Sequence, residues 1–181
     1  MIRGIVEFLV ERTRNVFRKF ADALKIASDL ERICDYAANV AKRSIALSQA
    51  PAIQPVHALP RMAHLALMLV KDVIDAYVDR DADKALDVWN RDEELDEMYS
   101  SLFREFLTYM MEDPRNIGVY THLLFMAKNI ERIGDHATNI AEDLYYLVYG
   151  RALDQARPKG DKSSLELVAS DRPAERGSGE P

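Results

Sequence analysis

One helical segment of this chain occurs twice, one hundred residues apart, and the repeated positions include polar residues. Residues 21–43 read ADALKIASDLERICDYAANVAKR, and residues 121–143 read THLLFMAKNIERIGDHATNIAED. A repeat that only built a hydrophobic core would mainly keep apolar residues. The matching positions are Leu24/Leu124, Ala27/Ala127, Glu31/Glu131, Arg32/Arg132, Ile33/Ile133, Asp35/Asp135, Ala37/Ala137, Asn39/Asn139 and Ala41/Ala141.

The repeated polar residues share one face of their helix. Glu31, Asp35 and Asn39 are spaced by four residues, and so are their counterparts one hundred positions later. Residues four apart lie one above the other on a helix. The pattern therefore predicts either a cation site or a row of ion pairs, presented twice.

Few helix-breaking residues interrupt the rest of the chain. Residues 61–149 contain one proline and two glycines, and their apolar residues recur every three or four positions, which is typical of amphipathic helices. Asp81 is expected to cap one helix at its N-terminus, and Gly150 another at its C-terminus. The expected helices run over about 16–48, 58–80, 83–111 and 116–149.

The fold class predicted from these helices is all-α, with tandem three-helix bundles. The last three helices, joined by short connections, predict one complete antiparallel bundle over residues 57–150. Residues 1–50 are expected to be the remnant of an equivalent first bundle, mainly its last helix. Residues 51–56 predict a linker, and residues 151–181, rich in Pro, Gly, Ser and charge, predict a disordered tail.

The offset of the repeat predicts that the first bundle is incomplete. The second bundle begins near residue 57, so its counterpart would begin at position −43, which this chain does not contain. The expected first bundle therefore has its last helix and at most a short piece of the helix before it. Truncation, a misplaced start and genuine loss would each produce this arrangement.

Composition disfavours several function classes. The net charge of −6 argues against nucleic acid as a partner, because phosphate binding needs a basic surface. The longest purely apolar run, residues 65–70, is far shorter than the roughly 20 residues of a membrane span. A single cysteine suits a reducing cytosol, so we expect a cytoplasmic protein. No Gly-rich phosphate loop or Gly-x-Ser-x-Gly motif occurs, and the absence of a Glu-x-x-His motif argues against a di-iron carboxylate oxidase.

Acidic residues on two helices of the second bundle are candidate metal ligands. Asp92 and Asp96 are four apart on one helix, and Glu131 and Asp135 are four apart on the next. Antiparallel packing would let the two pairs converge. Four adjacent carboxylates repel one another unless some are protonated or a hard cation binds among them. Such oxygen ligands suit Mg, Mn, Ca or Fe, and zinc is also compatible.

Ion pairs are the simpler interpretation of the same acidic residues. Arg32 and Arg132 are close enough in sequence to neutralise Asp35 and Asp135, and acidic pairs of this spacing are common on helices. From spacing alone, ion pairs are the favoured alternative and a metal site the second.

Several single residues are expected to have structural roles. Cys34 occupies the position of a glycine in the second copy of the repeat, so it is expected to be a small buried residue at a close helix contact. His136 is expected to be solvated or hydrogen-bonded rather than a ligand. The large aromatic residues Trp89, Tyr99, Phe103 and Phe106 are expected in the core.

The segments ALKIASDLERICDYAANVAKR and AKNIERIGDHATNIAEDLYYLVYG resemble the two signature helices of the PhoU family, the accessory regulators of phosphate-specific transport. The resemblance covers about residues 21–150, and NRDEELDEMY resembles the acidic motif of that family's second helix. It implies tandem three-helix bundles and, as in some members, metal clusters of iron or zinc. The metal ligands implied for this sequence are Glu31, Asp35, Asp92, Asp96, Glu131 and Asp135.

The resemblance implies regulation rather than catalysis. Members of the family restrain the phosphate-starvation response when phosphate is plentiful, and they link a phosphate ABC transporter to a membrane sensor histidine kinase. We therefore expect a cytoplasmic negative regulator of phosphate uptake and signalling that acts through protein contacts and forms a homo-oligomer such as a dimer. The alternatives are an enzyme with a carboxylate-bound metal and a purely structural helical adaptor.

Overall fold

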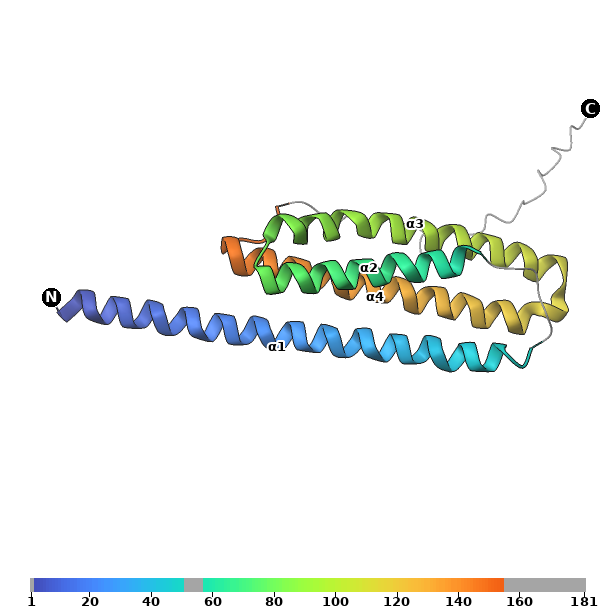
Figure 1. The fold of residues 1–181 in the computed structure, drawn as a ribbon, viewed down its shortest axis with the longest axis horizontal. Coiled ribbons are helices and arrows are strands. Elements are labelled where there is room, and N and C mark those ends of the chain that lie inside the picture. The colour runs from blue at the N-terminus through green and yellow to red at the C-terminus, as the bar shows by residue number, and fades with distance from the viewer. Residues whose placement is uncertain (1, 51–56, 155–181) are drawn as a thin grey trace, which may run out of the picture.

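The computed structural model describes residues 2–50 and 57–154, and within these ranges the chain is helical and contains no strand. The expected all-α fold class is therefore confirmed. A 3₁₀ turn, Pro114–Asn116, joins the last two helices. The four helices, in chain order, are α1 (Ile2–Leu47), α2 (Ala58–Asp79), α3 (Ala82–Glu112) and α4 (Ile117–Tyr149) (Figure 1).

The helix boundaries follow from local capping where the sequence supplies it. The Asp81 carboxylate begins α3 by accepting hydrogen bonds from the backbone N–H groups of Asp83 and Lys84, at 3.1 and 3.0 Å. Gly150 ends α4 in the left-handed conformation, with φ at 71°. The expected start of α1 near residue 16 is wrong, because the helix begins at Ile2. No proline lies between that residue and position 16 to stop it.

Helices α2, α3 and α4 pack as a three-helix bundle around one core. Of the aromatic residues expected in the core, Trp89, Tyr99 and Phe106 are buried, and Phe103 is partly buried against the core. None of the described helices combines the length and apolar character that crossing a bilayer requires. The bulkiest fully buried apolar side chains are Trp89, Phe106, Met62, Leu69, Leu95, Leu102, Ile140 and Leu144.

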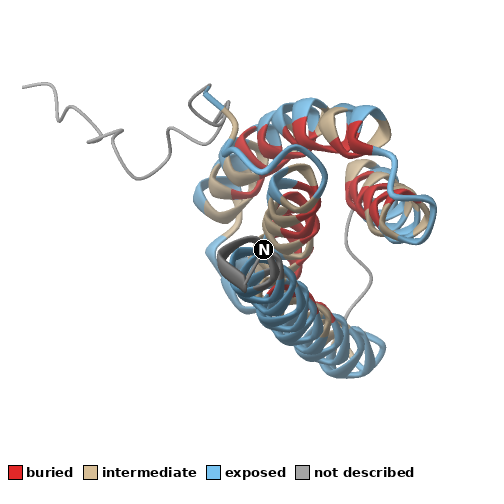
Figure 2. Cartoon of the chain, turned by 90° about the vertical axis from the view of Figure 1, so that its left-hand side faces the viewer, coloured by how far each residue is buried: buried red, intermediate tan, exposed pale blue. Residues whose placement is uncertain are grey.

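Helix α1 lies outside this bundle and, among the described helices, contacts α4 alone. It runs antiparallel to α4, and its N-terminal part extends past the end of α4 (Figure 1). Seen along the bundle, most of the outer surface of α1 is exposed (Figure 2). Helix α1, expected as the last helix of a first bundle, thus packs on the second bundle. The assignment of residues 1–50 to a separate first bundle stays a prediction. The predicted linker, residues 51–56, and residues 155–181 of the predicted tail lie outside the described residues.

The contacts between α1 and α4 have an approximate two-fold symmetry. Lys25 Nζ reaches Asp143 Oδ1 at 3.3 Å, and the counterpart of this pair in the repeat is position 43 against position 125. There the Arg43 guanidinium lies 4.4 Å from the centre of the Phe125 ring. The two copies of the repeat therefore meet along one antiparallel interface, and exchanging the two copies maps one of these contacts onto the other.

Candidate functional site

The four acidic residues predicted to converge line the contact between α3 and α4, which we call the carboxylate seam (Asp92, Asp96, Glu131 and Asp135). Asp92, Asp96 and Glu131 are 1%, 4% and 5% exposed, and Asp135 is half-buried. Carboxylates are almost never buried to this degree unless something compensates them. The seam is therefore the part of the bundle where burial and charge conflict most.

Gly134 allows the two helices to come this close. A Cβ atom at this position would lie 2.8 Å from Asp92 Oδ1, and it would overlap the Leu95 side chain. Helix α3 thus packs directly against the backbone of α4 at Gly134. In the sequence Gly134 follows Glu131 by three residues and precedes Asp135. The counterpart of Gly134 in α1 is Cys34, which is exposed. The expectation that Cys34 is buried is therefore wrong, because none of the described helices covers that side of α1.

Glu131 carries the strongest electrostatic perturbation of the seam. Burial, followed by the negative charges of Asp135 and Asp96, raises the pKa of its carboxyl group from an ordinary value of 4.5 to about 7. Lys128 opposes this rise, because its ammonium group donates a hydrogen bond to Glu131 Oε1 at 2.8 Å. The other oxygen, Oε2, is buried and accepts no hydrogen bond. The same ammonium lies 4.6 Å from the centre of the Tyr99 ring.

The acidic residues of the first copy of the repeat, Glu31 and Asp35, do not join the seam. Glu31 and Asp35 lie on the exposed surface of α1. The nearest ion pair connects Arg32 Nη1 to Asp35 Oδ2 at 4.0 Å, with both side chains 61% exposed. A solvated pair of this kind contributes little to stability. The structure thus brings together the second-bundle candidates and leaves Glu31 and Asp35 in solvent.

The seam provides oxygen donors, although it does not present a finished ligand set. Within residues 2–50 and 57–154, no group of three or more His, Cys, Asp or Glu side chains is arranged to hold a metal ion. Lys128 already supplies one positive charge to Glu131. A bound cation would give Glu131 Oε2 the partner it lacks. Iron or zinc at this position, or Mg or Mn, stays a prediction.

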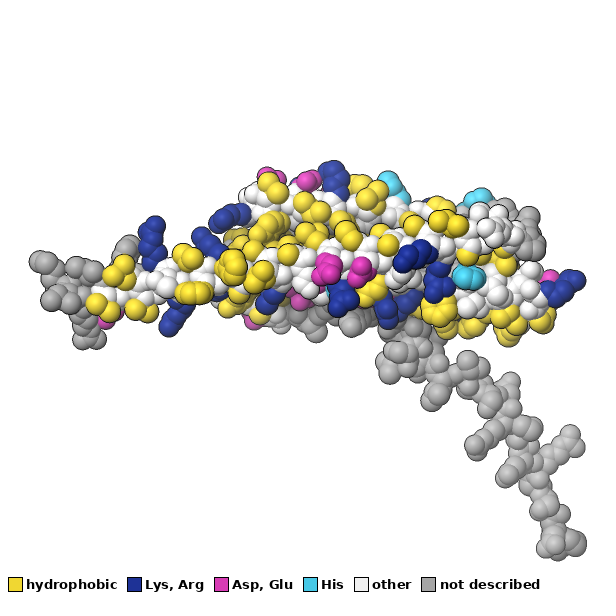
Figure 3. Space-filling model, turned by 90° about the horizontal axis from the view of Figure 1, so that it is seen from below, with side chains coloured by type: hydrophobic (Ala, Val, Ile, Leu, Met, Phe, Trp, Pro, Cys, Tyr) yellow, Lys and Arg dark blue, Asp and Glu magenta, His cyan; other side chains and the backbone are white. Residues whose placement is uncertain are grey.

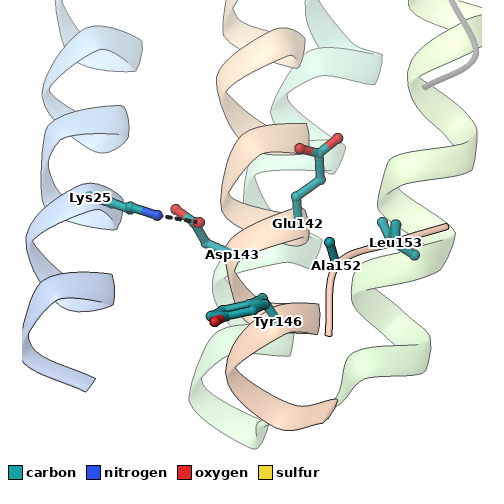
Figure 4. A pocket seen from close by; sticks show the side chains of 6 residues that line it. All are labelled: Lys25, Glu142, Asp143, Tyr146, Ala152 and Leu153. Atoms are coloured by element: carbon teal, nitrogen blue, oxygen red, sulfur yellow. Dashed lines mark hydrogen bonds and ion pairs between the residues drawn. The ribbon is translucent and has the colours of Figure 1, made fainter. Parts of the chain in front are cut away.

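A second acidic group, between α1 and α4, was not found from the sequence. Asp22 is 4% exposed, and its Oδ2 atom accepts no hydrogen bond. Burial raises the pKa of Asp143, while Lys25, which points toward it across the interface, lowers it (Figure 4). Asp29 lies 2.6 Å from His136 Nδ1, which confirms the expectation of a hydrogen-bonded histidine. This group could not be predicted from residue spacing within one helix, because its members come together only in the observed register of α1 against α4.

Comparison with known proteins gives consistent matches over most of the chain. The family model described as PhoU domain matches residues 59–144. The crystal structure of PhoU from Pseudomonas aeruginosa superposes with a TM-score of 0.73 at 36% identity, covering 82% of this chain and 75% of that one. The phosphate transport system regulatory protein PhoU from Streptococcus pneumoniae gives a TM-score of 0.70 at 30% identity, covering 78% and 67%.

Curated relatives with a similar sequence are longer than this chain. Phosphate-specific transport system accessory protein PhoU homologs from Rhizobium meliloti and Caulobacter vibrioides are each 52% identical to it, over 148 and 140 residues. The aligned regions cover 81% and 77% of this chain. This chain spans only 62% and 61% of those relatives.

Replacing Glu131 by Gln tests the conflict between burial and charge. The raised pKa means that folding favours the protonated carboxyl, so this contribution to stability is fully present below pH 4.5 and is lost as the pH rises through 7. Glu131→Gln mimics the protonated form and still accepts the hydrogen bond of Lys128. In chelator-treated protein it should raise the free energy of unfolding by about 2–3 kcal/mol at pH 8 and leave it nearly unchanged at pH 4.

Urea denaturation at the two pH values measures this difference. Exposed Glu97 provides the control, because Glu97→Gln should change the free energy of unfolding by less than about 0.5 kcal/mol at either pH. A Glu131→Gln effect of the same size at pH 4 and pH 8 would contradict the assigned pKa.

Adding a methyl group at Gly134 tests the close contact of α3 and α4. Gly134→Ala should lower the free energy of unfolding by about 1–3 kcal/mol, because the new Cβ meets Leu95 and Asp92. Gly118→Ala is the matched control in the same helix, since its Cβ would meet nothing within 4 Å. That variant should gain roughly 0.5–1 kcal/mol from reduced backbone entropy. If both variants were stabilised equally in thermal melts, the contact would be looser than described.

Proposed function

Because this chain belongs to the PhoU family, we propose that it regulates phosphate uptake and phosphate-starvation signalling. The observation that carries the proposal is the likeness of its folded body to PhoU crystal structures, together with relatives named as accessory proteins of phosphate-specific transport. The chain spans about three fifths of those curated relatives, so the role of the whole relative is a proposal for this chain.

In this proposal the protein acts through contacts with other proteins and is not an enzyme. Its partners are a phosphate ABC transporter and a membrane sensor histidine kinase, and it restrains the starvation response when phosphate is plentiful. Contact with parts of both partners that face the cytoplasm places the protein in that compartment. The length of the helices and their exposed side chains support such a role, because they present extended surfaces to a partner.

Complementation tests this function directly. The chain is expressed in a bacterium that lacks its own family member, and a reporter of the phosphate-starvation response is measured in phosphate-rich medium. We expect the reporter to be repressed. Leu102→Asp, which places a charge in the core at a position 1% exposed, is the control and should leave the reporter active. A reporter that stays fully active with the folded, unaltered chain would contradict the proposal.

We further propose that the carboxylate seam takes up a cation. The observation that favours this is the buried Oε2 atom of Glu131, which accepts no hydrogen bond beside two further negative charges. Asp96, Glu131 and Asp135 would hold the ion with Asp92 alongside, and the ion would neutralise their mutual repulsion. Iron or zinc follows from the family, and Mg or Mn from the oxygen donors. In this proposal the ion is structural or sensory.

Metal analysis of purified protein tests this second proposal. The Asp92→Ala/Asp135→Ala double variant should lose bound metal and the thermal stabilisation that metal gives to the unaltered chain. Glu31→Ala/Asp35→Ala is the matched control, because this pair has the same spacing on an exposed surface. It should retain the full metal content. Equal metal content in the unaltered chain and the Asp92→Ala/Asp135→Ala variant would remove the site.

A further inference from the structure

A groove between α1 and the C-terminal half of α4 holds acidic side chains that are separate from the carboxylate seam. We call it the acidic groove and define it by Lys25, Asp29, Asn139, Glu142, Asp143 and Tyr146. It consists of two adjoining cavities of about 480 and 350 Å³, which share Lys25, Glu142 and Asp143 as lining residues. Figure 4 shows Lys25 reaching from α1 toward Asp143 of α4 at this groove. A polar cavity of this size can hold a small organic molecule.

The acidic side chains of the groove belong to the interface of the two helices and not to the outer surface of α1. The side chains of Asp29 and Asp143 are 16% and 20% exposed. Figure 3 shows mostly hydrophobic and basic side chains on the side of the molecule that α1 covers. Contacts with α4 therefore position these carboxylates, whatever lies against the outer side of α1.

Asp22 brings a buried carboxylate oxygen without a partner to this groove. It lies three residues before Lys25 and seven before Asp29, so the three side chains share one face of α1. Asp22 is 4% exposed, and its Oδ2 atom accepts no hydrogen bond from the described residues. Burial raises the pKa of Asp143, and the nearby charge of Asp22 raises it as well. A buried oxygen in this state is costly, so a donor placed in the groove would be stabilised there.

Neighbouring side chains hold two further carboxylates of the groove in place. The His136 ring lies against Asp29, with Nδ1 2.6 Å from Oδ1. On α4, Glu142 Oε1 accepts a hydrogen bond of 2.9 Å from the indole N–H group of Trp89. An indole donor carries no charge, so Glu142 keeps its negative charge. The groove is therefore preorganised, because these carboxylates are fixed before a ligand arrives.

Positive charge at the groove does not balance its carboxylates. The Lys25 ammonium lies 3.3 Å from Asp143 Oδ1, but 62% of the Lys25 side chain is exposed, so this ion pair is solvated and weak. The Arg18 guanidinium lies 5.2 Å from the centre of the Tyr146 ring. A protonated His136 would bring the positive charges among these residues to three, against four carboxylates. The groove therefore favours a cationic ligand.

The carboxylates are spread along the groove and do not surround one point. Asp22 and Asp29 are seven residues apart on α1, which corresponds to roughly 10 Å. A metal ion instead needs its oxygen ligands within about 2–2.6 Å of one centre. In a linear polyamine, three or four methylene groups separate successive ammonium groups by roughly 5–6 Å, about one helical turn. Its methylene groups would pack on Tyr146 and Leu153, which also line the groove.

We propose that the acidic groove binds a linear aliphatic polyamine, whose ammonium groups pair with Asp22, Glu142 and Asp143. The ligand takes over the contact of Lys25 with Asp143 and supplies the donor that Asp22 Oδ2 lacks. It contacts both helices, and among the described helices α1 contacts α4 alone. Binding of the polyamine therefore strengthens the attachment of α1 to the bundle.

Isothermal titration calorimetry of the whole 181-residue chain with spermidine tests this proposal. In about 150 mM salt, which screens non-specific attraction to an acidic protein, we expect saturable binding at one site. Asp22→Asn should weaken binding about tenfold, because it removes a charge-assisted hydrogen bond. Asp35→Asn is the matched control, since it makes the same change in net charge on the exposed surface of α1. That variant should bind spermidine as the unaltered chain does.

Three results of this titration would overturn the proposal. The first is the absence of saturable binding. The second is equal weakening by Asp22→Asn and Asp35→Asn, which would show attraction to net charge alone. The third is displacement of spermidine by an equal concentration of Mg²⁺, which would identify a metal-ion site instead. Circular dichroism should show unchanged helix content in Asp22→Asn, because this variant removes a buried charge and no hydrogen bond of Oδ2.

Lys25→Met provides an independent measurement with the opposite sign. Methionine keeps much of the apolar stem of the side chain and removes the ammonium group that competes with the ligand for Asp143. Spermidine binding should therefore become about threefold to tenfold tighter. A ligand held in the carboxylate seam would not respond to this change. Unchanged or weaker binding by Lys25→Met would contradict the proposed position of the polyamine.

Discussion

The close contact of α3 with the backbone of α4 at Gly134 determines the chemistry of the bundle. Because no side chain separates the helices there, Asp92, Asp96 and Glu131 are drawn out of water together. Their burial raises the pKa of Glu131, and Lys128 returns part of the lost solvation through its hydrogen bond. Packing and electrostatics in this bundle are therefore inseparable, since any change in helix separation also changes the charge of the seam.

Much of this fold could be predicted because its signals are local. Apolar spacing located α2, α3 and α4, and Asp81 and Gly150 marked two of their ends. Burial on α1 could not be inferred in the same way. Cys34 has the sequence context of a buried residue, and its exposure depends on which helix lies over it. The Asp22 group likewise exists only because α1 and α4 meet in one particular register.

The two copies of the repeat show how one pattern behaves in two environments. On α4 the repeated acidic residues lie against α3, and burial there raises the pKa of Glu131. On α1 the equivalent residues Glu31 and Asp35 are exposed to solvent, and the ion pair of Asp35 contributes little to stability. The family relationship thus fixes the pattern of the helices, while the helices that surround each copy decide its physical state. This difference makes the seam, and not the equivalent residues of α1, the candidate for binding a cation.

Helix α4 contacts each of the other described helices, whereas α1 contacts α4 alone. Helix α4 is therefore shared by two packing interfaces, one with α1 and the other with α2 and α3. Separating α1 from the bundle would break this single interface and would leave the contacts among α2, α3 and α4 intact, so α1 can detach without exposing the three-helix core.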